Sequence, residues 1–378
     1  MKIMYCLLGT FNSGGMERVL ANKANYLVRA GNEVVIVTTD QQGRPPFFEL
    51  DARIEQIDLG INYTANVGRN FLGKFWSYLF KRQQHQKKLK RLLEQLKADI
   101  TVSMFDHDAS FLFKSKDNSK KILEIHFSRY KRLQYGRKGV WKLLDVWLSR
   151  RDLKIARSYD RFVVLTQEDR GYWGDLVNIR VIPNAHSFNL DETATLEKSN
   201  VVAVGRYDYQ KGFDELIAIW SEVHRQHPDW QLSIYGNGPL KEDMKRQIAA
   251  LGLEDSVRLC DPVKHIEQVY LQSALLLMTS RYEGLPMVLL EAQACGVPMV
   301  SYACKCGPKD IISDGENGYL IPEGERELFS QRIDALIRDV SLRKKMGQVA
   351  KLRSEGFSED KVMEKWVELF TELTGVKK

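Results

Sequence analysis

The chain has 378 residues, of which 44% are hydrophobic, and this length and composition favour about two domains with real cores. No apolar run approaches the roughly 20 residues that a transmembrane helix needs, and five cysteines, an odd number, do not indicate a disulfide framework. Residues 1–190 carry 32 Lys and Arg against 19 Asp and Glu, whereas the remaining residues carry 24 against 30. We therefore expect a cytoplasmic protein whose basic half meets an acidic partner, with membrane contact, if any, peripheral at the inner face of the cell membrane.

The chain opens with the pattern of a βαβ unit. A strand is expected at Lys2–Leu8, a helix at Met16–Arg29 and a second strand at Val34–Thr38. The loop before the helix contains Gly14 and Gly15, which fit neither the G-x-G-x-x-G pattern of dinucleotide sites nor the P-loop. These glycines instead indicate a close approach of the backbone to a ligand.

Two predicted helices carry much of the basic charge. Phe71–Lys97 begins with aromatic residues and continues as a strongly basic run, and Arg129–Arg157 repeats this composition. Two interpretations stay open for such helices: a solvated face over a core stripe, or peripheral binding to an anionic membrane. Trp141, Leu144 and Trp147 recur at helical spacing, and we expect their side chains in the core.

Two further strands end in residues that carry chemistry. Asp99–Phe105 is followed by Asp106-His107-Asp108, an Asp-x-Asp pattern that can hold a divalent ion against a diphosphate. Lys121–Ile125 is followed by His126, which places the imidazole at the carboxyl end of a strand, where open α/β sheets bind ligands. The metal site and a metal-free site are competing hypotheses.

A second domain is expected to begin after a polar segment without periodicity, Asn184–Asn200. Its first strand, Val201–Val204, leads into Gly205-Arg-Tyr-Asp-Tyr-Gln-Lys-Gly212. Arg206 and Lys211 then lie at the carboxyl edge of the strand, where two cations can neutralise a diphosphate as its charge grows.

The most informative stretch combines a buried strand, an elbow and an apolar helix. Ala274–Met278 is the strand, Pro286 suits the first turn of the helix, and Gly296 suits its end. Glu291 is a single carboxylate on this apolar helix, and Glu283 lies in the elbow before it. Two carboxylates that flank an anion site describe a nucleotide-sugar, with one accepting from the ribose diol and the other from sugar hydroxyls.

The start of that helix supplies the anion site itself. Free backbone amides and the positive end of the helix dipole favour a phosphate at this point. The amides available are those of Gly284, Leu285 and Met287, because Pro286 has none. Glu359–Thr374 is expected to form an amphipathic C-terminal helix.

These motifs together resemble the family-4 retaining glycosyltransferases with the GT-B fold, of the type found in bacterial polysaccharide or glycolipid synthesis. The resemblance covers nearly the whole chain and is strongest from Val204 to Pro322. It rests on Gly14-Gly15-Met-Glu, Gly205-Arg206 to Lys211-Gly212, the E-x7-E pair Glu283 and Glu291, Gly307-Pro308-x-Asp310, and Asp314 to Pro322. It implies two Rossmann-like doubly wound domains that face each other across a cleft.

The resemblance also implies roles and domain bounds. The acceptor-side domain would span 1–190, the nucleotide-sugar domain 191–355, and a helix in 356–378 would pack back on the first domain. The reaction would transfer a hexose or N-acetylhexosamine with retention and without a metal or other cofactor. The residues assigned by this analogy are His126 near the anomeric end of the sugar, Arg206, Lys211, Gly284, Leu285 and Met287 at the diphosphate, Glu283 at the sugar hydroxyls, Glu291 at the ribose, and Gly14 and Gly15 facing donor and acceptor.

The donor and acceptor are predicted only as classes. A UDP-sugar is favoured and GDP-mannose is next, although Asp261-Pro262 stands where relatives often carry glycine near the base. The acceptor is expected to be a saccharide or a lipid-linked glycan. An epimerase or hydrolase of nucleotide-sugars with a related fold is the alternative, and a basic nucleic-acid-binding protein is a distant one, because no nucleic-acid module accompanies the basic segments.

Overall fold

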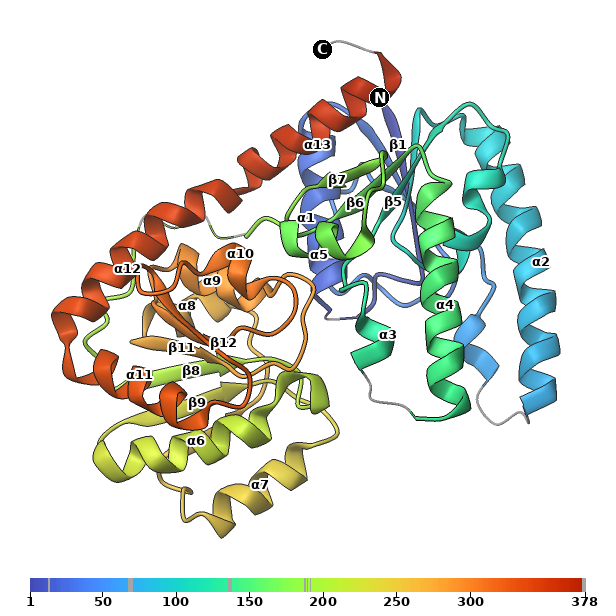
Figure 1. The fold of residues 1–378 in the computed structure, drawn as a ribbon. Helices are drawn as coiled ribbons and strands as arrows, with labels where there is room; N and C mark the ends of the chain where they lie inside the picture. Colours follow the sequence, from blue (N-terminus) through green and yellow to red (C-terminus); the bar gives the residue numbers. More distant parts are fainter. Residues whose placement is uncertain are drawn as a thin grey trace. The chain divides into compact units, whose positions relative to one another are not determined.

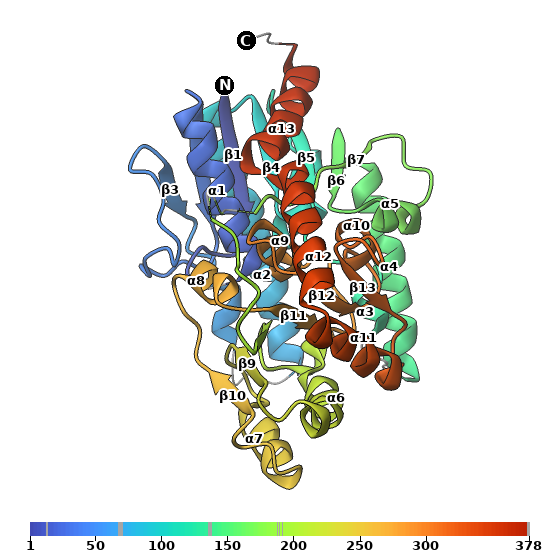
Figure 2. The same cartoon turned by 90° about the vertical axis from the view of Figure 1, so that its left-hand side faces the viewer.

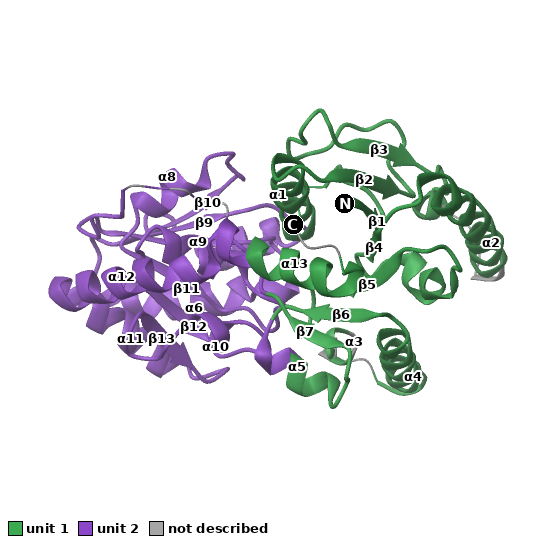
Figure 3. Cartoon of the chain, turned by 90° about the horizontal axis from the view of Figure 1, so that it is seen from above, with its two compact units in different colours: residues 1–165, 170–182, 363–378 green, residues 166–169, 183–362 purple. Residues whose placement is uncertain are grey.

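The computed structural model describes residues 1–12, 14–66, 71–134, 138–186, 188, 190 and 192–375. Ser13 of the predicted glycine loop, 135–137 of the second basic segment, and 187, 189 and 191 of the predicted linker therefore lie outside the described residues. The chain divides into two compact units, which are coloured separately in Figure 3. Unit 1 comprises Met1–Leu165, Arg170–Ile182 and Met363–Lys378, and unit 2 comprises Thr166–Asp169 and Pro183–Val362.

Unit 1 is built on a seven-stranded parallel sheet in the order β3-β2-β1-β4-β5-β6-β7. The chain begins in the middle of the sheet, builds outward on one side, and then returns to build the other side from β4. The sheet therefore has a switch point between β1 and β4, and ligands of doubly wound sheets bind at the carboxyl ends of such strands. The strands are β1 Lys2–Leu7, β2 Glu33–Thr38, β3 Glu55–Asp58, β4 Ile100–Ser103, β5 Lys120–Glu124, β6 Arg161–Val164 and β7 Ile179–Val181.

Helices cover both faces of this sheet (Figure 3). One face carries α1 and α13, and the other carries α2 and α4. The α-helices are α1 Gly15–Arg29, α2 Phe71–Leu96, α3 Lys131–Gln134, α4 Val140–Arg157, α5 Gln167–Trp173 and α13 Glu359–Thr374, with 3-10 turns at Tyr63–Asn66, His107–Ser110 and Leu112–Lys114. The central strands are almost wholly apolar and buried, as parallel strands covered on both faces must be.

Unit 2 repeats the plan with a six-stranded parallel sheet in the order β10-β9-β8-β11-β12-β13. Its switch point lies between β8 and β11, which are neighbours in the sheet. The strands are β8 Asn200–Val204, β9 Gln231–Tyr235, β10 Val257–Cys260, β11 Leu275–Met278, β12 Met299–Tyr302 and β13 Gly318–Ile321. Both sheets confirm the predicted α/β class with two doubly wound, Rossmann-like sheets.

The helices of unit 2 lie between or after these strands in the chain and cover the sheet (Figures 1 and 2). They are α6 Phe213–Gln226, α7 Lys241–Ala250, α8 Ile266–Leu271, α9 Met287–Ala294, α10 Pro308–Ile311, α11 Arg326–Arg338 and α12 Val340–Ser354, with 3-10 turns at Tyr209–Lys211 and Glu355–Phe357. Trp220 and Phe329 are fully buried in the core of this unit. None of the helices within the described residues combines the length and apolarity that crossing a bilayer requires.

One expectation about the basic helices is wrong. Trp141 and Trp147 of α4 are 57% and 58% exposed, and Leu144 is exposed as well. The face of α4 that is buried instead carries polar residues in its first half, including Asp145 and Ser149. These residues do lie on a helix at the predicted spacing, but the apolar stripe that they form faces solvent. Spacing alone does not say which face of a helix packs on the sheet.

Candidate active site

The loop after β8 brings a lysine and a carboxylate together at the carboxyl edge of the unit 2 sheet. Lys211 Nζ lies 2.7 Å from Glu283 Oε1, and the two side chains are only 18% and 7% exposed. Glu283 follows β11, the strand next to β8, so the switch point of the sheet creates this contact. Gln210 Nε2 adds a donor 3.5 Å from the other Glu283 oxygen and donates to Tyr282 O at 3.0 Å. The pair is therefore oriented from both sides.

Arg206 lies in the same loop but is held differently. Its guanidinium contacts Asp208, with Nε 2.6 Å from Oδ2, and its side chain is 71% exposed. Asp208 also accepts from the Lys211 amide at the start of the 3-10 turn. A surface pair of this kind is weak, so Arg206 is available to an incoming anion at little cost.

The elbow after β11 leads directly into α9, an apolar helix of eight residues. Pro286 is the residue before the helix rather than its first residue, with φ −71° and ψ 108°, which corrects the expected first-turn position by one residue. The predicted end at Gly296 is confirmed, since its φ of +71° suits a glycine after a helix. Among the described residues, no group accepts from the amides of Gly284, Leu285 and Met287. These donors and the helix dipole make an anion site.

Glu291 lies one turn into α9 and is 3% exposed. Its Oε2 accepts from the hydroxyl of Tyr270 at 2.9 Å, and Tyr270 itself is fully buried on α8. A buried carboxylate that is oriented by a tyrosine is well placed to accept from a polar ligand, because its own position is already fixed.

The glycine after β12 supports the elbow from beneath. Gly307 has a φ of +99°, and a Cβ added there would lie 2.3 Å from Pro286 Cδ and 3.1 Å from Leu285 Cα. Only glycine combines this backbone conformation with so close an approach. The Gly307-Pro308 motif therefore positions the backbone of the elbow.

The predicted glycines of unit 1 lie at the start of α1. Gly14 precedes the helix in an extended conformation and Gly15 is its first residue. A Cβ on Gly14 would meet the carboxylate of Glu17 at 2.3 Å, and Glu17 in turn accepts from Asn12 Nδ2 at 3.2 Å. The carboxylate thus packs under the loop at the carboxyl end of β1.

His126 follows β5 at the same edge of the unit 1 sheet and is 7% exposed. Its Nε2 lies 3.0 Å from Glu124 Oε1, which in turn lies 2.6 Å from Lys23 Nζ. Burial alone would raise the pKa of Glu124, but Lys23 and His126 outweigh burial and hold that pKa at about 2. Glu124 is therefore an ionised carboxylate inside the protein.

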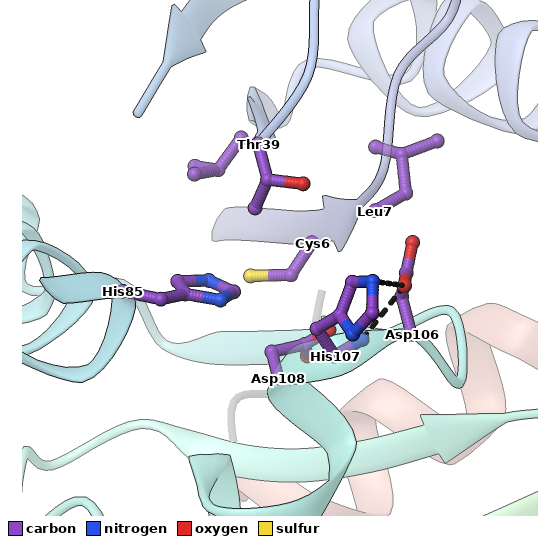
Figure 4. Close-up of a pocket in the computed structure, with 8 residues that line it drawn as sticks. Cys6, Leu7, Thr39, His85, Asp106, His107 and Asp108 are labelled. Atoms are coloured by element: carbon purple, nitrogen blue, oxygen red, sulfur yellow. Dashed lines mark hydrogen bonds and ion pairs between the residues drawn. The ribbon is translucent and has the colours of Figure 1, made fainter. Parts of the chain in front are cut away.

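The Asp-x-Asp segment after β4 borders a pocket whose lining includes Cys6, Thr39 and His85 (Figure 4). Its two carboxylates lie in different environments. Asp106 is an ion-pair partner of the His107 ring at 3.7 Å, whereas Asp108 is 1% exposed and burial raises its pKa to about 7. Burial raises the pKa of Asp106 as well, so neither carboxyl group is a typical surface acid. The described part of the chain contains no group of three or more His, Cys, Asp or Glu arranged to hold a metal ion.

Four residues near the predicted ones were not singled out from the sequence. Tyr270 and Gln210 carry no pattern of their own and act through Glu291 and Glu283. Lys23 and Glu124 are 101 positions apart, so only the folded chain shows that they meet. The one available signal was the acidic residue at the end of the strand Lys120–Glu124, two positions before the predicted His126.

The elbow predicts a specific effect on stability. Gly307→Ala should lower the free energy of unfolding by about 2 to 4 kcal/mol, because positive φ and the contact with Pro286 both oppose a side chain. Gly315→Ala is the matched control, since Gly315 has a φ of +78° but open space around it, and it should lose only about 1 kcal/mol. Urea unfolding measures both values, and equal losses would contradict this role of Gly307.

Comparisons with known proteins identify the family of this chain. The family described as "Glycosyl transferases group 1" matches residues 190–353, and "Glycosyltransferase Family 4" matches residues 13–187. A protein of Haemophilus influenzae called "Uncharacterized glycosyltransferase" is 30% identical over 373 residues, covering 97% of this chain and 98% of that protein.

Two further similarities extend over almost the whole chain. The "GalNAc-alpha-(1->4)-GalNAc-alpha-(1->3)-diNAcBac-PP-undecaprenol alpha-1,4-N-acetyl-D-galactosaminyltransferase" of Campylobacter jejuni is 24% identical over 379 residues, covering 99% of each chain. The crystal structure of an S. aureus TarM mutant in complex with fondaparinux, α-GlcNAc-glycerol and UDP has a TM-score of 0.77 at 19% identity, covering 98% of this chain and 99% of that one. The chain therefore belongs to the family-4 glycosyltransferases with the GT-B fold, and it is a hexosyltransferase.

Proposed function

We propose that the protein transfers a hexose or N-acetylhexosamine from a UDP-sugar, with retention of configuration, to a saccharide or lipid-linked acceptor. The observation that carries this proposal is the buried pair of Lys211 and Glu283 beside the free amides of the α9 elbow. This arrangement puts a cation, an anion site and an acceptor of hydroxyl protons at one sheet edge. GDP-mannose is the next donor to consider.

The charges of the site suit a departing diphosphate. The bond between the anomeric carbon and the diphosphate oxygen breaks, and its electron pair stays on that oxygen. Lys211, Arg206 and the elbow amides stabilise the negative charge that develops there. The acceptor hydroxyl oxygen forms the new bond to the anomeric carbon, and its proton passes to the departing diphosphate. In this account charge neutralisation is supplied by side chains and backbone without a metal ion.

The remaining residues hold the rest of the donor. Glu291, fixed by Tyr270, accepts from the ribose diol, and Glu283 accepts from hydroxyls of the sugar. His126 contacts the sugar near its anomeric end, and Gly14 and Gly15 allow the backbone to approach the donor and the acceptor. Cys304 is no candidate for a covalent nucleophile, since burial, with Glu283 next in effect, raises the pKa of its thiol well above the usual range.

The names of similar proteins support the substrate classes. The TarM structure is described as a complex with UDP, which favours uracil as the nucleobase here. The Campylobacter enzyme is named for a glycan on undecaprenyl diphosphate, which favours a lipid-linked acceptor. Such an acceptor requires that the enzyme work at a membrane surface.

Unit 1 has a surface suited to that location. We call it the aromatic-basic face, and it consists of the exposed side chains Phe75, Trp76 and Phe80 of α2 with Val140, Trp141, Leu143, Leu144 and Trp147 of α4. Both helices carry these residues in their first halves, which lie toward the same end of unit 1 in Figure 1. Exposed cations interleave with them, among them Lys74, Lys142 and Arg150. Aromatic side chains with interleaved cations fit an anionic lipid surface.

The donor site predicts how turnover responds to charge removal. Arg206→Ala and Lys211→Ala should each lower turnover of a UDP-sugar by roughly a hundredfold, because each removes a donor to the developing charge. Lys344→Ala is the control, since Lys344 forms a surface pair with Glu197 in the same unit and should leave turnover unchanged. Normal turnover in both folded site variants would contradict the proposal.

Product analysis with and without acceptor separates transfer from hydrolysis or epimerisation, and the anomeric configuration of the product tests retention.

The aromatic-basic face predicts selective lipid binding. The purified protein should bind vesicles with anionic lipid at low salt and bind neutral vesicles weakly. A Trp141→Ser and Trp147→Ser double variant should bind anionic vesicles roughly tenfold or more weaker, because two indoles lose their burial. Val177→Ser is the control, since Val177 is 98% exposed elsewhere on unit 1 and should have no effect. An absence of binding to anionic vesicles would count against a lipid-linked acceptor.

A further inference from the structure

Unit 1 contains an ion pair in which both side chains are buried, near the carboxyl edge of its sheet. Lys23 comes from the middle of α1 and is 4% exposed, and Glu124 ends β5 and is 1% exposed. Their charged atoms lie 2.6 Å apart. A buried pair of this kind rarely adds stability over apolar residues of the same volume, because removing both charges from water is costly. Its presence therefore calls for a role other than stability.

Aromatic rings enclose the ammonium group of Lys23. The Trp366 ring on α13 has its centroid 3.7 Å from Nζ, and the Tyr5 ring on β1 has its centroid 5.8 Å away. Trp366 is 1% exposed, so it also excludes water. Figure 3 shows α1 and α13 on the same face of the sheet, which allows this contact. The lysine is thus held over the carboxylate with little freedom to turn away.

The same carboxylate oxygen that binds Lys23 also faces His126. Nε2 of the imidazole lies 3.0 Å from Glu124 Oε1, and among the described residues neither Nε2 nor the buried Nδ1 has a hydrogen-bond partner. The ring N–H is not aligned with the oxygen in this structure, and catalytic hydrogen bonds commonly align only when a ligand is bound. A buried ring nitrogen without a partner indicates a position reserved for a ligand atom.

We propose that Lys23 and Glu124 are positioning residues that keep the hydrogen of His126 on Nε2, so that Nδ1 offers a lone pair to a hydroxyl of the transferred sugar. An ionised carboxylate only accepts, so the nitrogen that faces it must carry the hydrogen. In the neutral ring the other nitrogen is then an acceptor. The pair of Lys23 and Glu124 carries no net charge, so it orients the ring without requiring a cation there. The sugar hydroxyl in this statement rests on the proposed function, whereas the position of the hydrogen does not.

Removal of the lysine should reverse this arrangement. In Lys23→Met the buried carboxylate of Glu124 loses its counter-charge. A proton is then taken up by either His126 or Glu124. If His126 takes it, both ring nitrogens carry hydrogen. If Glu124 takes it and donates to Nε2, the ring hydrogen moves to Nδ1. In both cases Nδ1 stops being an acceptor.

Nitrogen NMR of the histidine rings tests this directly in the full chain. The protein has seven histidines, so His126→Asn identifies the signal of interest. Wild type near pH 7.5 should show His126 with hydrogen on Nε2 and a bare Nδ1, and Lys23→Met should show a protonated Nδ1. Lys23→Arg should retain the wild-type pattern, because it keeps the charge. Lys121→Met is the matched control, because it also removes a buried, paired lysine. Lys121 lies on β5, the strand of Glu124, is 5% exposed, and has its Nζ 2.6 Å from Asp117 Oδ1.

Two results would overturn the inference. One is a wild-type ring with hydrogen on Nδ1, and the other is an unchanged Nδ1 signal in folded Lys23→Met. Kinetics add a second measurement: Lys23→Met should lower kcat for a UDP-sugar by about tenfold or more and change KM for the donor by less than about threefold. If the protein turns over no nucleotide-sugar, the proposed function fails while the ring signals still decide the position of the hydrogen.

Discussion

The contact between Lys211 and Glu283 is the interaction on which the candidate active site depends. It joins the loop after β8 to the elbow after β11, two connections that come from neighbouring strands at the switch point of the sheet. Both charges are largely withdrawn from water, so each fixes the other. The free amides of α9 begin directly behind Glu283, and Gly307 holds that backbone in place. In the proposed function, this ion pair connects the proposed phosphate site to the proposed sugar site.

The two units have the same type of parallel sheet, but the charged side chains at the carboxyl ends of their strands differ in exposure. In unit 2 Arg206 is mostly exposed, which suits a site that must meet a charged donor from solution. In unit 1 Lys23 and Glu124 are buried, with the Trp366 ring packed on the ammonium group of Lys23. In the inference above, this pair acts on the substrate only through His126. An exposed cation binds a substrate, whereas a buried pair orients a neighbouring group.

Much of this account could be predicted from the sequence, and the failures have physical causes. Three features could be predicted because their residues are close together in the chain, so that sequence spacing determines where they lie. They are the E-x7-E pair, the elbow before α9, and Arg206 with Lys211. Lys23 and Glu124 meet only through tertiary packing, which no local pattern records. Trp141 and Trp147 were assigned to the core because they share a helical stripe, but the opposite stripe, with Asp145, faces inward. Composition did not reveal which face the sheet covers.

The central claim is that the start of α9 and the carboxylate of Glu291 bind a nucleotide-sugar without a metal ion. Calorimetry with UDP-, GDP- and ADP-sugars, with no added metal, against wild type and Glu291→Ala tests it most directly. The account predicts that UDP-sugars bind the wild-type protein and that this binding is lost in the variant. Binding that requires manganese, or that survives the substitution, would contradict the account and direct attention to Asp106 and Asp108.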